Sequence, residues 1–395
     1  MAAINILLLL AALALLLPSL VLVAEVLAGA LPSKVPAVFS GRRARIAVIV
    51  PAHDEASGIS ATVHSIRQQL SSEDRLLVVA DNCSDATGSI AASLGAEVVE
   101  RSDLERRGKA YAVAFGIRHL AVDPPDVVIV IDADCELSPG CLYRIGQEAF
   151  ESGTPVQAHN RVLFDNQKMS PQLAHRAFAF KVKNTLRPTG LRNLGLPCQL
   201  MGTGMALPWR LVELRNLGSG ELAEDLVWGL QFAKDGHAPR FCPEVSVTSQ
   251  HPNTAEGQAT QRARWETGHL TTIYRHVPRL LLDAIKYRNM PLFTLALDAA
   301  VPPLALHALC VGALAVLTAL WFLAGGSGAP LVLAAVTIAA LTTALAVAWA
   351  KVGREHIAPA DMLAVPVYAL SKVPLYAQIL LGRQGSWVRT KRDRE

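Results

Sequence analysis

The sequence lacks the motifs that identify the commonest nucleotide-binding and metal-binding folds. No G-x-G-x-x-G follows its first predicted strand, which disfavours a dinucleotide-dependent oxidoreductase. No G-x-x-x-x-G-K-[ST] occurs, which disfavours a P-loop nucleotidase. The six cysteines are scattered without a C-x-x-C pair, so neither a zinc site nor a disulfide framework is indicated. We expect them to be reduced thiols.

Charge is scarce as well. Only 18% of the residues are charged and the net charge is +4, so a general affinity for nucleic acid is not indicated. Hydrophobic residues make up 51% of the chain, which is too many for an ordinary soluble enzyme. We therefore expect the apolar residues to be concentrated in membrane segments, with a polar domain between them.

The first apolar run predicts a transmembrane helix over residues 1–32. It is interrupted only by Pro18, Ser19 and Glu25, and it exceeds the ~20 residues that cross a hydrocarbon core. A cleaved signal peptide is the alternative, but such a peptide begins with basic residues and none precedes this run. Basic residues follow it instead, so the positive-inside rule places the next domain in the cytoplasm.

Two later apolar stretches predict a transmembrane hairpin over residues 293–350. They cover about Phe293–Leu323 and Leu331–Ala350, and the turn-forming Gly325–Gly328 separates them. Basic residues flank both ends of the hairpin, so we expect it to leave and re-enter the cytoplasm.

The segments on either side of the hairpin are expected at the membrane surface. Residues 271–292 are predicted as an interfacial segment. Residues 360–395 predict an interfacial or re-entrant helix and a basic tail, because Lys372 and two prolines interrupt the apolar run. A spanning helix there would put the basic tail outside, against the charge rule.

Residues 43–270 predict a doubly wound α/β domain. Short aliphatic runs alternate with helical patterns, which is typical of a mainly parallel sheet with helices on both faces. Such sheets bind ligands beyond the carboxyl ends of their strands. The runs that we interpret as buried strands are Arg45–Pro51, Arg75–Ala80, Ala96–Val99 and Asp126–Asp132.

Acidic side chains follow three of these strands. Glu55 follows the first, Asp81 the second, and Asp132 and Asp134 the fourth. Carboxylates that converge on one sheet edge repel each other, and a divalent cation relieves that repulsion. Oxygen ligands suit Mg²⁺ or Mn²⁺, and Lys109 would add a positive charge for a nucleotide. A lone D-x-D is more often a solvated turn, but its place after a buried strand favours a metal site.

Two further stretches carry candidate functional residues. Glu224 and Asp225 open a predicted helix, where the helix dipole alone could also account for acidic residues. Gln261, Arg264 and Trp265 fall on one face of a later helix, a combination that an apolar core would not use. The alternative for the latter group is a Trp–Arg pair at the membrane interface.

Seven short motifs occur in a fixed order between Arg45 and Gly268. They are VIVPAHDEA (48–56), VVADNCSDAT (78–87), RGKAYAVAFG (107–116), DADCE (132–136), MGTGMALP (201–208), AEDLVWGLQ (223–231) and QRARW (261–265). With these motifs in this order, the chain resembles the membrane-embedded family 2 glycosyltransferases, the inverting group that includes cellulose synthases, hyaluronan synthases and ceramide glucosyltransferases.

The resemblance implies a GT-A fold and assigns a role to each motif. It implies that the catalytic base is Asp225, with Glu224 beside it, and that Asp132 and Asp134 hold the metal. The implied nucleotide contacts are Ala52, Glu55, Asp81, Lys109 and Asp132. The implied contacts to the diphosphate and acceptor are Gln261, Arg264, Trp265, Gly202, Thr203 and Gly204.

The sequence departs from the family pattern at three points. His53-Asp54 replaces a common Tyr-Asn pair, and Ala223 replaces a threonine in the base motif. About three spanning segments are visible, fewer than long polymer channels usually need, which disfavours processive secretion.

The implied activity is transfer of a sugar from a nucleotide sugar, with uridine diphosphate as carrier, to a lipid or lipid-linked acceptor. The expected role lies in surface polysaccharide or glycolipid synthesis. The expected location is the inner (plasma) membrane, multi-pass, with the catalytic domain in the cytoplasm. Two alternatives stay open, a processive polysaccharide synthase and a non-catalytic nucleotide-binding membrane scaffold. A nucleic-acid partner is not expected.

Overall fold

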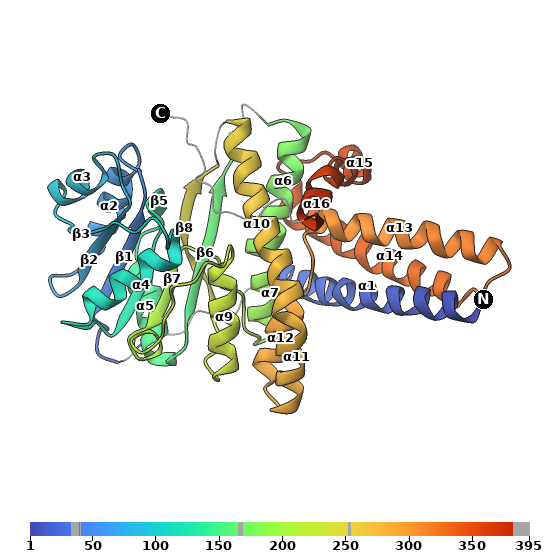
Figure 1. The fold of residues 1–395 in the computed structure, drawn as a ribbon, viewed down its shortest axis with the longest axis horizontal. Helices are drawn as coiled ribbons and strands as arrows, with labels where there is room; N and C mark the ends of the chain where they lie inside the picture. Colours follow the sequence, from blue (N-terminus) through green and yellow to red (C-terminus); the bar gives the residue numbers. More distant parts are fainter. Residues whose placement is uncertain (33–38, 40, 165–168, 252–253, 382–395) are drawn as a thin grey trace.

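Eight strands form one mixed sheet at the centre of the larger part of the chain, in the order β3-β2-β1-β4-β7-β6-β8-β5 (Figure 1). The computed structural model describes residues 1–32, 39, 41–164, 169–251 and 254–381. Strands β3, β2, β1 and β4 are parallel neighbours, and β7 runs antiparallel to β4 and β6. The strands are β1 (Ile46–Ala52), β2 (Arg75–Asp81), β3 (Glu97–Arg101), β4 (Val127–Val130), β5 (Cys135–Leu137), β6 (Val156–Leu163), β7 (Met205–Pro208) and β8 (Arg240–Gln250).

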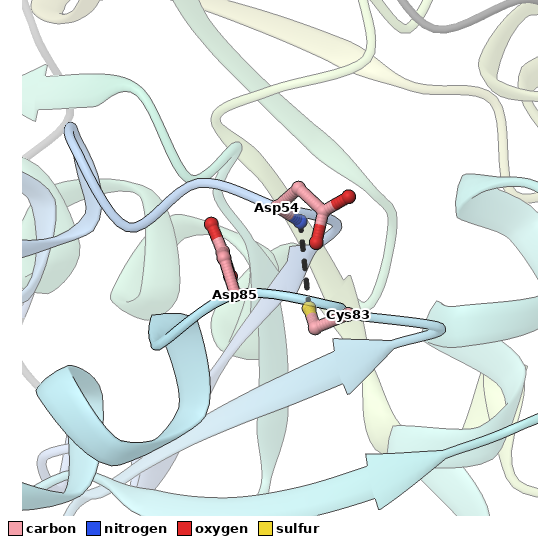
Figure 2. A group of neighbouring side chains, drawn as sticks. All are labelled: Asp54, Cys83 and Asp85. Atoms are coloured by element: carbon pink, nitrogen blue, oxygen red, sulfur yellow. Dashed lines mark hydrogen bonds between the residues drawn. The ribbon is translucent and has the colours of Figure 1, made fainter. Parts of the chain in front are cut away.

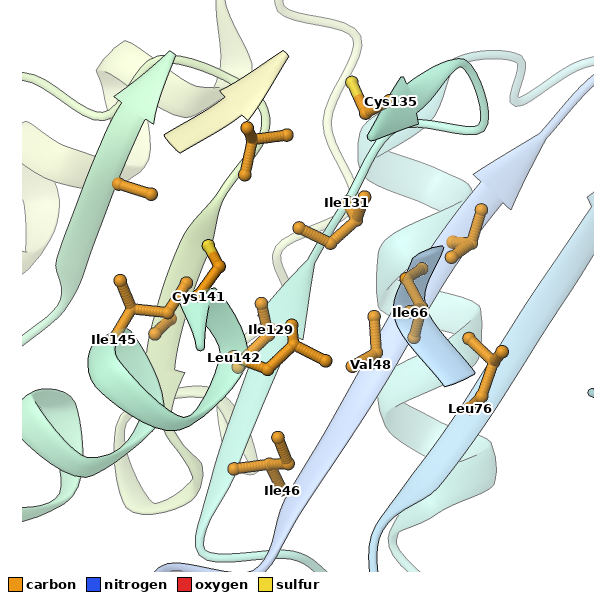
Figure 3. Close-up of a cluster of buried hydrophobic side chains, with 14 of the residues drawn as sticks. Ile46, Val48, Ile66, Leu76, Ile129, Ile131, Cys135, Cys141, Leu142 and Ile145 are labelled. Atoms are coloured by element: carbon orange, nitrogen blue, oxygen red, sulfur yellow. The ribbon is translucent and has the colours of Figure 1, made fainter. Parts of the chain in front are cut away.

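Helices cover both faces of the sheet, because the central strands are apolar on both faces. All four residues of β4 are fully buried. Figure 3 shows one face, where Val48 and Ile129 pack against Ile66 of α2 and Leu142 of α5. The helices on that face are α2 (Ile59–Arg67), α3 (Thr87–Ser93) and α5 (Cys141–Ser152). Those on the other face are α4 (Lys109–Leu120), α8 (Trp209–Val212) and α9 (Glu224–Lys234).

The predicted fold class is confirmed. The four predicted strands end within two residues of the observed β1 to β4. Their parallel pairing puts the carboxyl ends of β1, β2 and β4 at one edge of the sheet, which is where the acidic residues were expected to meet.

A layer of helices separates the sheet from the long apolar helices (Figure 1). It contains a five-residue π-helix, η2, between α6 and α7. The members of this layer are α6 (Pro171–Lys181), η2 (Val182–Leu186), α7 (Arg187–Asn193), α10 (Ala255–Arg275), α11 (Val277–Lys286) and α12 (Met290–Ala299).

Three helices are long and apolar enough to cross a membrane. They are α1 (Ala2–Gly29), α13 (Leu304–Leu323) and α14 (Ala329–Ala348), and α14 continues into the π-helix η3 (Trp349–Gly353). All three project from the same side of the helical layer, side by side (Figure 1). The chain therefore divides into a sheet domain and an apolar bundle.

The apolar stretch Phe293–Leu323, predicted as one segment, is two helices. Its first part belongs to α12 in the helical layer, and α13 begins only after Pro302 and Pro303. Proline lacks a backbone donor and restricts the residue before it, so the pair ends one helix and starts another.

The C-terminal stretch forms three short helices, each well below the length of a membrane span. They are η4 (Pro359–Ala364), α15 (Val365–Leu370) and α16 (Val373–Leu380). They lie where the apolar bundle meets the helical layer (Figure 1). The basic tail, 382–395, lies outside the described residues.

A buried cluster of charges joins α1 to the helical layer. Arg187 of α7 donates from Nε to Glu25 Oε2 of α1 at 2.5 Å and from Nη2 to Asp298 Oδ1 of α12 at 2.5 Å. Gln199 Nε2 donates to the other oxygen of Asp298 at 2.9 Å. The three charged residues are at most 5% exposed. Removing one member of such a cluster leaves an unpaired buried charge, which costs about 3–5 kcal/mol.

Glycines let α1 and α7 approach closely beside this cluster. A Cβ built at Gly190 would lie 1.9 Å from the carbonyl oxygen of Glu25, and one built at Gly29 would lie 2.1 Å from that of Leu186. Both positions therefore exclude any side chain, and the backbones of the two helices touch directly.

Replacing Gly190 with alanine should force α1 away from α7 and stretch the Glu25–Arg187 pair. We expect Gly190→Ala to cost about 1–3 kcal/mol, typical of overpacking, and to lower the melting temperature of the protein in nanodiscs. Gly312→Ala is the matched control, because no atom lies within 4 Å of its added methyl group. Equal melting temperatures for the two variants would contradict the close contact.

Candidate active site

The acidic strand ends open into a cleft of about 380 Å³ between the sheet and the helical layer. That volume is within the range of small-molecule sites. Gly204 is the one predicted site residue that does not line it. Those that do are Ala52, Glu55, Asp81, Lys109, Asp132, Asp134, Gly202, Thr203, Glu224, Asp225, Gln261, Arg264 and Trp265.

Two of the residues predicted to contact the nucleotide lie at the ends of parallel strands. Ala52 is the last residue of β1 and Asp81 the last of β2. Asp81 Oδ1 accepts hydrogen bonds from Arg101 Nη1 at 2.6 Å and from Asn82 Nδ2 at 3.0 Å. Burial raises the pKa of Asp81, although Arg101 opposes this. The side chain is thus fixed by a salt bridge at the rim of the cleft.

The D-x-D turn follows β4 and is braced by the loop of the MGTGMALP motif. Lys109 forms an ion pair with Asp132 and also donates to the carbonyl oxygen of Gly202 at 2.7 Å. The backbone N–H of Asp132 donates to Thr203 Oγ1 at 3.0 Å. Burial lowers the pKa of Lys109, but Asp132 and Glu224 outweigh burial and raise it. The lysine therefore stays charged and holds two segments of the cleft together.

Gly204 has a backbone role instead of the predicted place in the acceptor pocket. Its N–H donates to the carbonyl oxygen of Val130 at 2.9 Å, and its carbonyl accepts from the Ala158 N–H at 2.8 Å. Its φ of 71° and the side chain of Val247, 2.9 Å from a built Cβ, both require glycine. It therefore connects β4 to β6 beneath the cleft.

Asp132 and Asp134 could hold a divalent metal ion. Together with Cys135 they place ligand atoms within 4.8 Å of one another. Burial, together with the two carboxylates, raises the pKa of the Cys135 thiol well above its usual value, so it stays protonated. The usable donors are then carboxylate oxygens, which suit Mg²⁺ or Mn²⁺, as the sequence predicted.

A second acidic cluster, Asp54, Cys83 and Asp85, has a structural explanation (Figure 2). Asp54 Oδ1 accepts from the Ser84 N–H at 2.6 Å, and the Asp54 N–H donates to Cys83 Sγ at 3.4 Å. Asp85 accepts from the N–H groups of Ala56 and Thr87 at 3.0 and 2.9 Å. These bonds fasten the loop after β1 to the loop after β2.

The predicted base and its neighbour begin α9 and face the D-x-D turn. Burial raises the pKa of Glu224 to about 7, and the nearby Asp225 adds to this. Burial also raises the pKa of Asp225, while Lys109 opposes the rise. A Cβ built at Gly202 would lie 3.4 Å from Asp225 Oδ2 and 3.6 Å from Lys109 Nζ. Asp225 and the lysine that pairs with Asp132 therefore meet across Gly202.

The QRARW motif lies on α10, on the membrane side of the cleft. Gln261, Arg264 and Trp265 all line the cavity, as their shared helical face predicted. The Trp265 ring lies 6.1 Å from that of Phe180, centroid to centroid. Trp265 is 42% exposed and borders the cleft, so it offers a flat apolar surface there.

Several cleft residues were not predicted from the sequence. They come from η2, α7, α10 and α12, and they are Lys183, Asn184, Arg187, His269 and Asp298. None lies in a recognised motif. One signal was available, the charged Glu25 inside an apolar run, because a charge there requires a partner from another element.

The chain matches one family model and several known proteins. Residues 44–268 match the family described as glycosyltransferase-like family 2, and this range contains all seven motifs, so the predicted resemblance is confirmed.

A curated relative and a solved structure are also similar. The probable glycosyltransferase YdaM of Bacillus subtilis (strain 168) is 25% identical over 237 residues, 57% of this chain and 55% of that protein. The chain thus spans about half the length of this relative. The mannosyltransferase PcManGT from Pyrobaculum calidifontis, solved with GDP-Man and Mn²⁺, is 18% identical over 93% of this chain and 100% of its own, with a TM-score of 0.54. This likeness shows a shared fold.

The raised pKa of Glu224 predicts a stability that falls with rising pH. The folded protein keeps a proton that the unfolded chain releases above the ordinary pKa of 4.5. The stabilisation is complete below about pH 4.5 and lost as the pH rises through about 7. In Glu224→Gln, the melting temperature should fall less between pH 5 and 8 than in the wild type. The exposed Glu213→Gln should keep the wild-type slope, and a Glu224→Gln slope equal to it would contradict the assignment.

Proposed function

The chain belongs to glycosyltransferase-like family 2, and we propose that it transfers a sugar from a nucleotide-sugar donor to an acceptor at a membrane surface. The observation that carries this proposal is one cleft, lined by Asp132, Asp134, Asp225 and Arg264, beside three helices able to span a membrane. Displacing a diphosphate leaving group requires positive charge near the diphosphate and a base near the acceptor hydroxyl, and residues of both kinds line this cleft.

We assign the nucleotide to the strand ends of β1 and β2. Ala52, Glu55 and Asp81 line this part of the cleft, with Lys109 between them and Asp132. The family resemblance favours uridine diphosphate as the carrier. The donor bound to the similar mannosyltransferase is GDP-Man, so a guanosine carrier is the alternative to test.

We assign the diphosphate to the D-x-D turn and α10. Asp132 and Asp134 would hold Mg²⁺ or Mn²⁺, which when bound neutralises the charge that develops on the leaving diphosphate. Arg264 has no ion-pair partner among the described residues, so its guanidinium is available to clamp phosphate oxygens. Gln261 and Trp265 extend this surface towards the acceptor.

Asp225 is the proposed base, with Glu224 beside it. A carboxylate whose pKa is raised by burial is a stronger base than an exposed one. Asp225 would take the proton of the acceptor hydroxyl as its oxygen attacks the anomeric carbon, which inverts that carbon in one displacement. Gly202, beside both Asp225 and Lys109, leaves room for the reacting groups between them.

The membrane helices favour a membrane-bound acceptor, a lipid or a lipid-linked glycan. Basic residues between α1 and the sheet domain, and on the domain side of α13 and α14, support a cytoplasmic catalytic domain by the positive-inside rule. Confinement to the bilayer raises the effective concentration of such an acceptor. We propose single addition at the plasma membrane in surface polysaccharide or glycolipid synthesis, and product length separates it from processive synthesis.

Asp225→Asn should abolish sugar transfer and leave nucleotide binding nearly intact. The amide is similar in size to the carboxylate but cannot accept the proton, so turnover should fall about 10²- to 10⁴-fold. Transfer is measured by mass spectrometry of products from UDP- and GDP-sugars with extracted membrane lipids as acceptors. Asp235→Asn, at the exposed far end of α9, is the control. Wild-type turnover in Asp225→Asn would refute the base assignment.

Asp134→Ala should remove metal-dependent donor binding. Loss of a carboxylate ligand should weaken the Mn²⁺-dependent affinity for the nucleotide sugar at least about tenfold, measured by titration calorimetry with Mn²⁺ or with a chelator. Glu136→Ala, two residues further along and exposed, should bind as the wild type does. Donor affinity that responds neither to chelator nor to Asp134→Ala would rule out this metal site.

A further inference from the structure

The cleft continues past Asp225 towards the membrane helices, and no family motif contributes to this part. We call it the membrane arm, and its lining includes Phe180, Lys183, Asn184, Arg187, His269 and Asp298. Lys183 and Asn184 are carried by the π-helix η2, a wide turn that often occurs at functional sites. The same π-helix ends at Leu186, whose carbonyl touches Gly29 of α1. The arm thus lies between the proposed base and the N-terminal membrane helix.

Three other basic groups near Lys183 are already neutralised, and Arg264 is the one assigned above to the diphosphate. Arg187 is held between Glu25 and Asp298, and Lys109 is paired with Asp132. Burial lowers the pKa of His269 well below its usual value, and its Nε2 lies 3.0 Å from the carbonyl oxygen of Ala299. His269 is therefore uncharged, and these groups leave no positive charge free in the arm.

Lys183 differs from them. Within the described part of the chain it has no ion pair or hydrogen bond, and the same holds for the Asn184 side chain. Its side chain is exposed to the cleft that it helps to line. Desolvation in the cleft lowers the pKa of Lys183, and Asp225 is the strongest electrostatic influence against this shift.

An ammonium group that is open to the cleft and has no partner among the described residues can pair with an anionic group of a molecule that enters the cleft. Asp225 cannot be that anion permanently, because a base must be free to take a proton from the acceptor. A phosphate oxygen is a strong partner for a lysine, and an adjacent amide such as Asn184 can add a donor. Because the arm lies against α1, we expect this anion to belong to a molecule held in the bilayer.

We propose that Lys183 binds a phosphate group of the acceptor, so that the acceptor is a phosphate-bearing lipid or lipid-linked sugar and not a neutral glycolipid. This inference rests on the proposed function and specifies its acceptor. Lys183 is then a specificity-determining residue: it contacts the acceptor beside the reacting hydroxyl and sets which lipid is used.

The test compares three synthetic acceptors that carry the same sugar: a long-chain lipid with a phosphate linkage, the same chain with a neutral linkage, and the soluble sugar phosphate. The protein is used as the full chain in nanodiscs, and kcat/KM is measured with its active donor. We expect the wild type to prefer the phosphate-linked lipid over the neutral lipid by about tenfold or more, as one charge-assisted hydrogen bond provides. It should also prefer it over the soluble phosphate.

Two substitutions at Lys183 and one at a nearby lysine test whether Lys183 causes the preference for the phosphate-linked lipid. Lys183→Met should bring the ratio of phosphate-linked to neutral lipid close to one, and Lys183→Arg should restore most of it. Lys181→Met is the matched control, because Lys181 pairs with Glu355 at 2.6 Å outside the cleft, and it should keep the wild-type ratio.

The outcomes distinguish a failure of the phosphate inference from a failure of the proposed glycosyl transfer. A wild type without preference for phosphate, or a Lys183→Met protein that keeps the preference, would overturn the inference while leaving glycosyl transfer standing. A kcat/KM for the soluble sugar phosphate equal to that for the phosphate-linked lipid would overturn the inference that the phosphate belongs to a lipid in the bilayer. A wild type that neither transfers sugar nor hydrolyses any donor would refute the proposed function itself. The wild-type ratio needs no variant, so the inference stays testable if Lys183→Met does not fold.

Discussion

Arg187 connects parts of the chain that are far apart in sequence. Its guanidinium holds Glu25, 162 positions away, and Asp298, 111 positions away, inside the protein. The three elements that carry these residues are a membrane helix and two helices of the layer above the cleft. Since a buried ion cluster tolerates little displacement, the cleft and the apolar bundle keep one relative position. The cleft and the three apolar helices therefore form a single unit.

The cleft itself depends on a balance of like charges. Parallel strands deliver carboxylates to one edge, and their repulsion would oppose folding if nothing compensated for it. Lys109 compensates part of it by pairing with Asp132 and by touching the Gly202 loop. The remaining repulsion favours the protonated form of Glu224, because burial and the charge of Asp225 raise its pKa to about 7. A divalent cation held by Asp132 and Asp134 would relieve part of this repulsion, so the assembled acids favour cation binding.

Local pattern predicted half of the sheet, and pattern together with the family motifs predicted thirteen of the residues that line the cleft. Strands β1, β2 and β4 are mainly aliphatic runs buried on both faces, so composition indicates them. Strands β5 to β8 escaped prediction because β5 and β7 are short and β8 mixes polar and apolar residues. Many motif residues lie in the cavity because they end or follow a strand or open a helix, as Asp81, Asp132 and Glu224 do. Lys183 and Arg187 escaped because neither lies in a motif, and Arg187 acts through contacts with distant segments. Gly204 was misassigned because a motif does not distinguish backbone function from ligand contact.

The length of α1 has a consequence for where chemistry takes place. Its 28 residues extend about 42 Å at 1.5 Å per residue, whereas a hydrocarbon core is about 30 Å thick. A helix that crosses the bilayer upright from its first turn would emerge on the other side by several ångströms, and Glu25 would stand at the level of the lipid head groups. The length of α1 would then set the distance between the cleft and the bilayer. The cleft, whose lining includes the Arg187 that pairs with Glu25, would then lie close to the head groups.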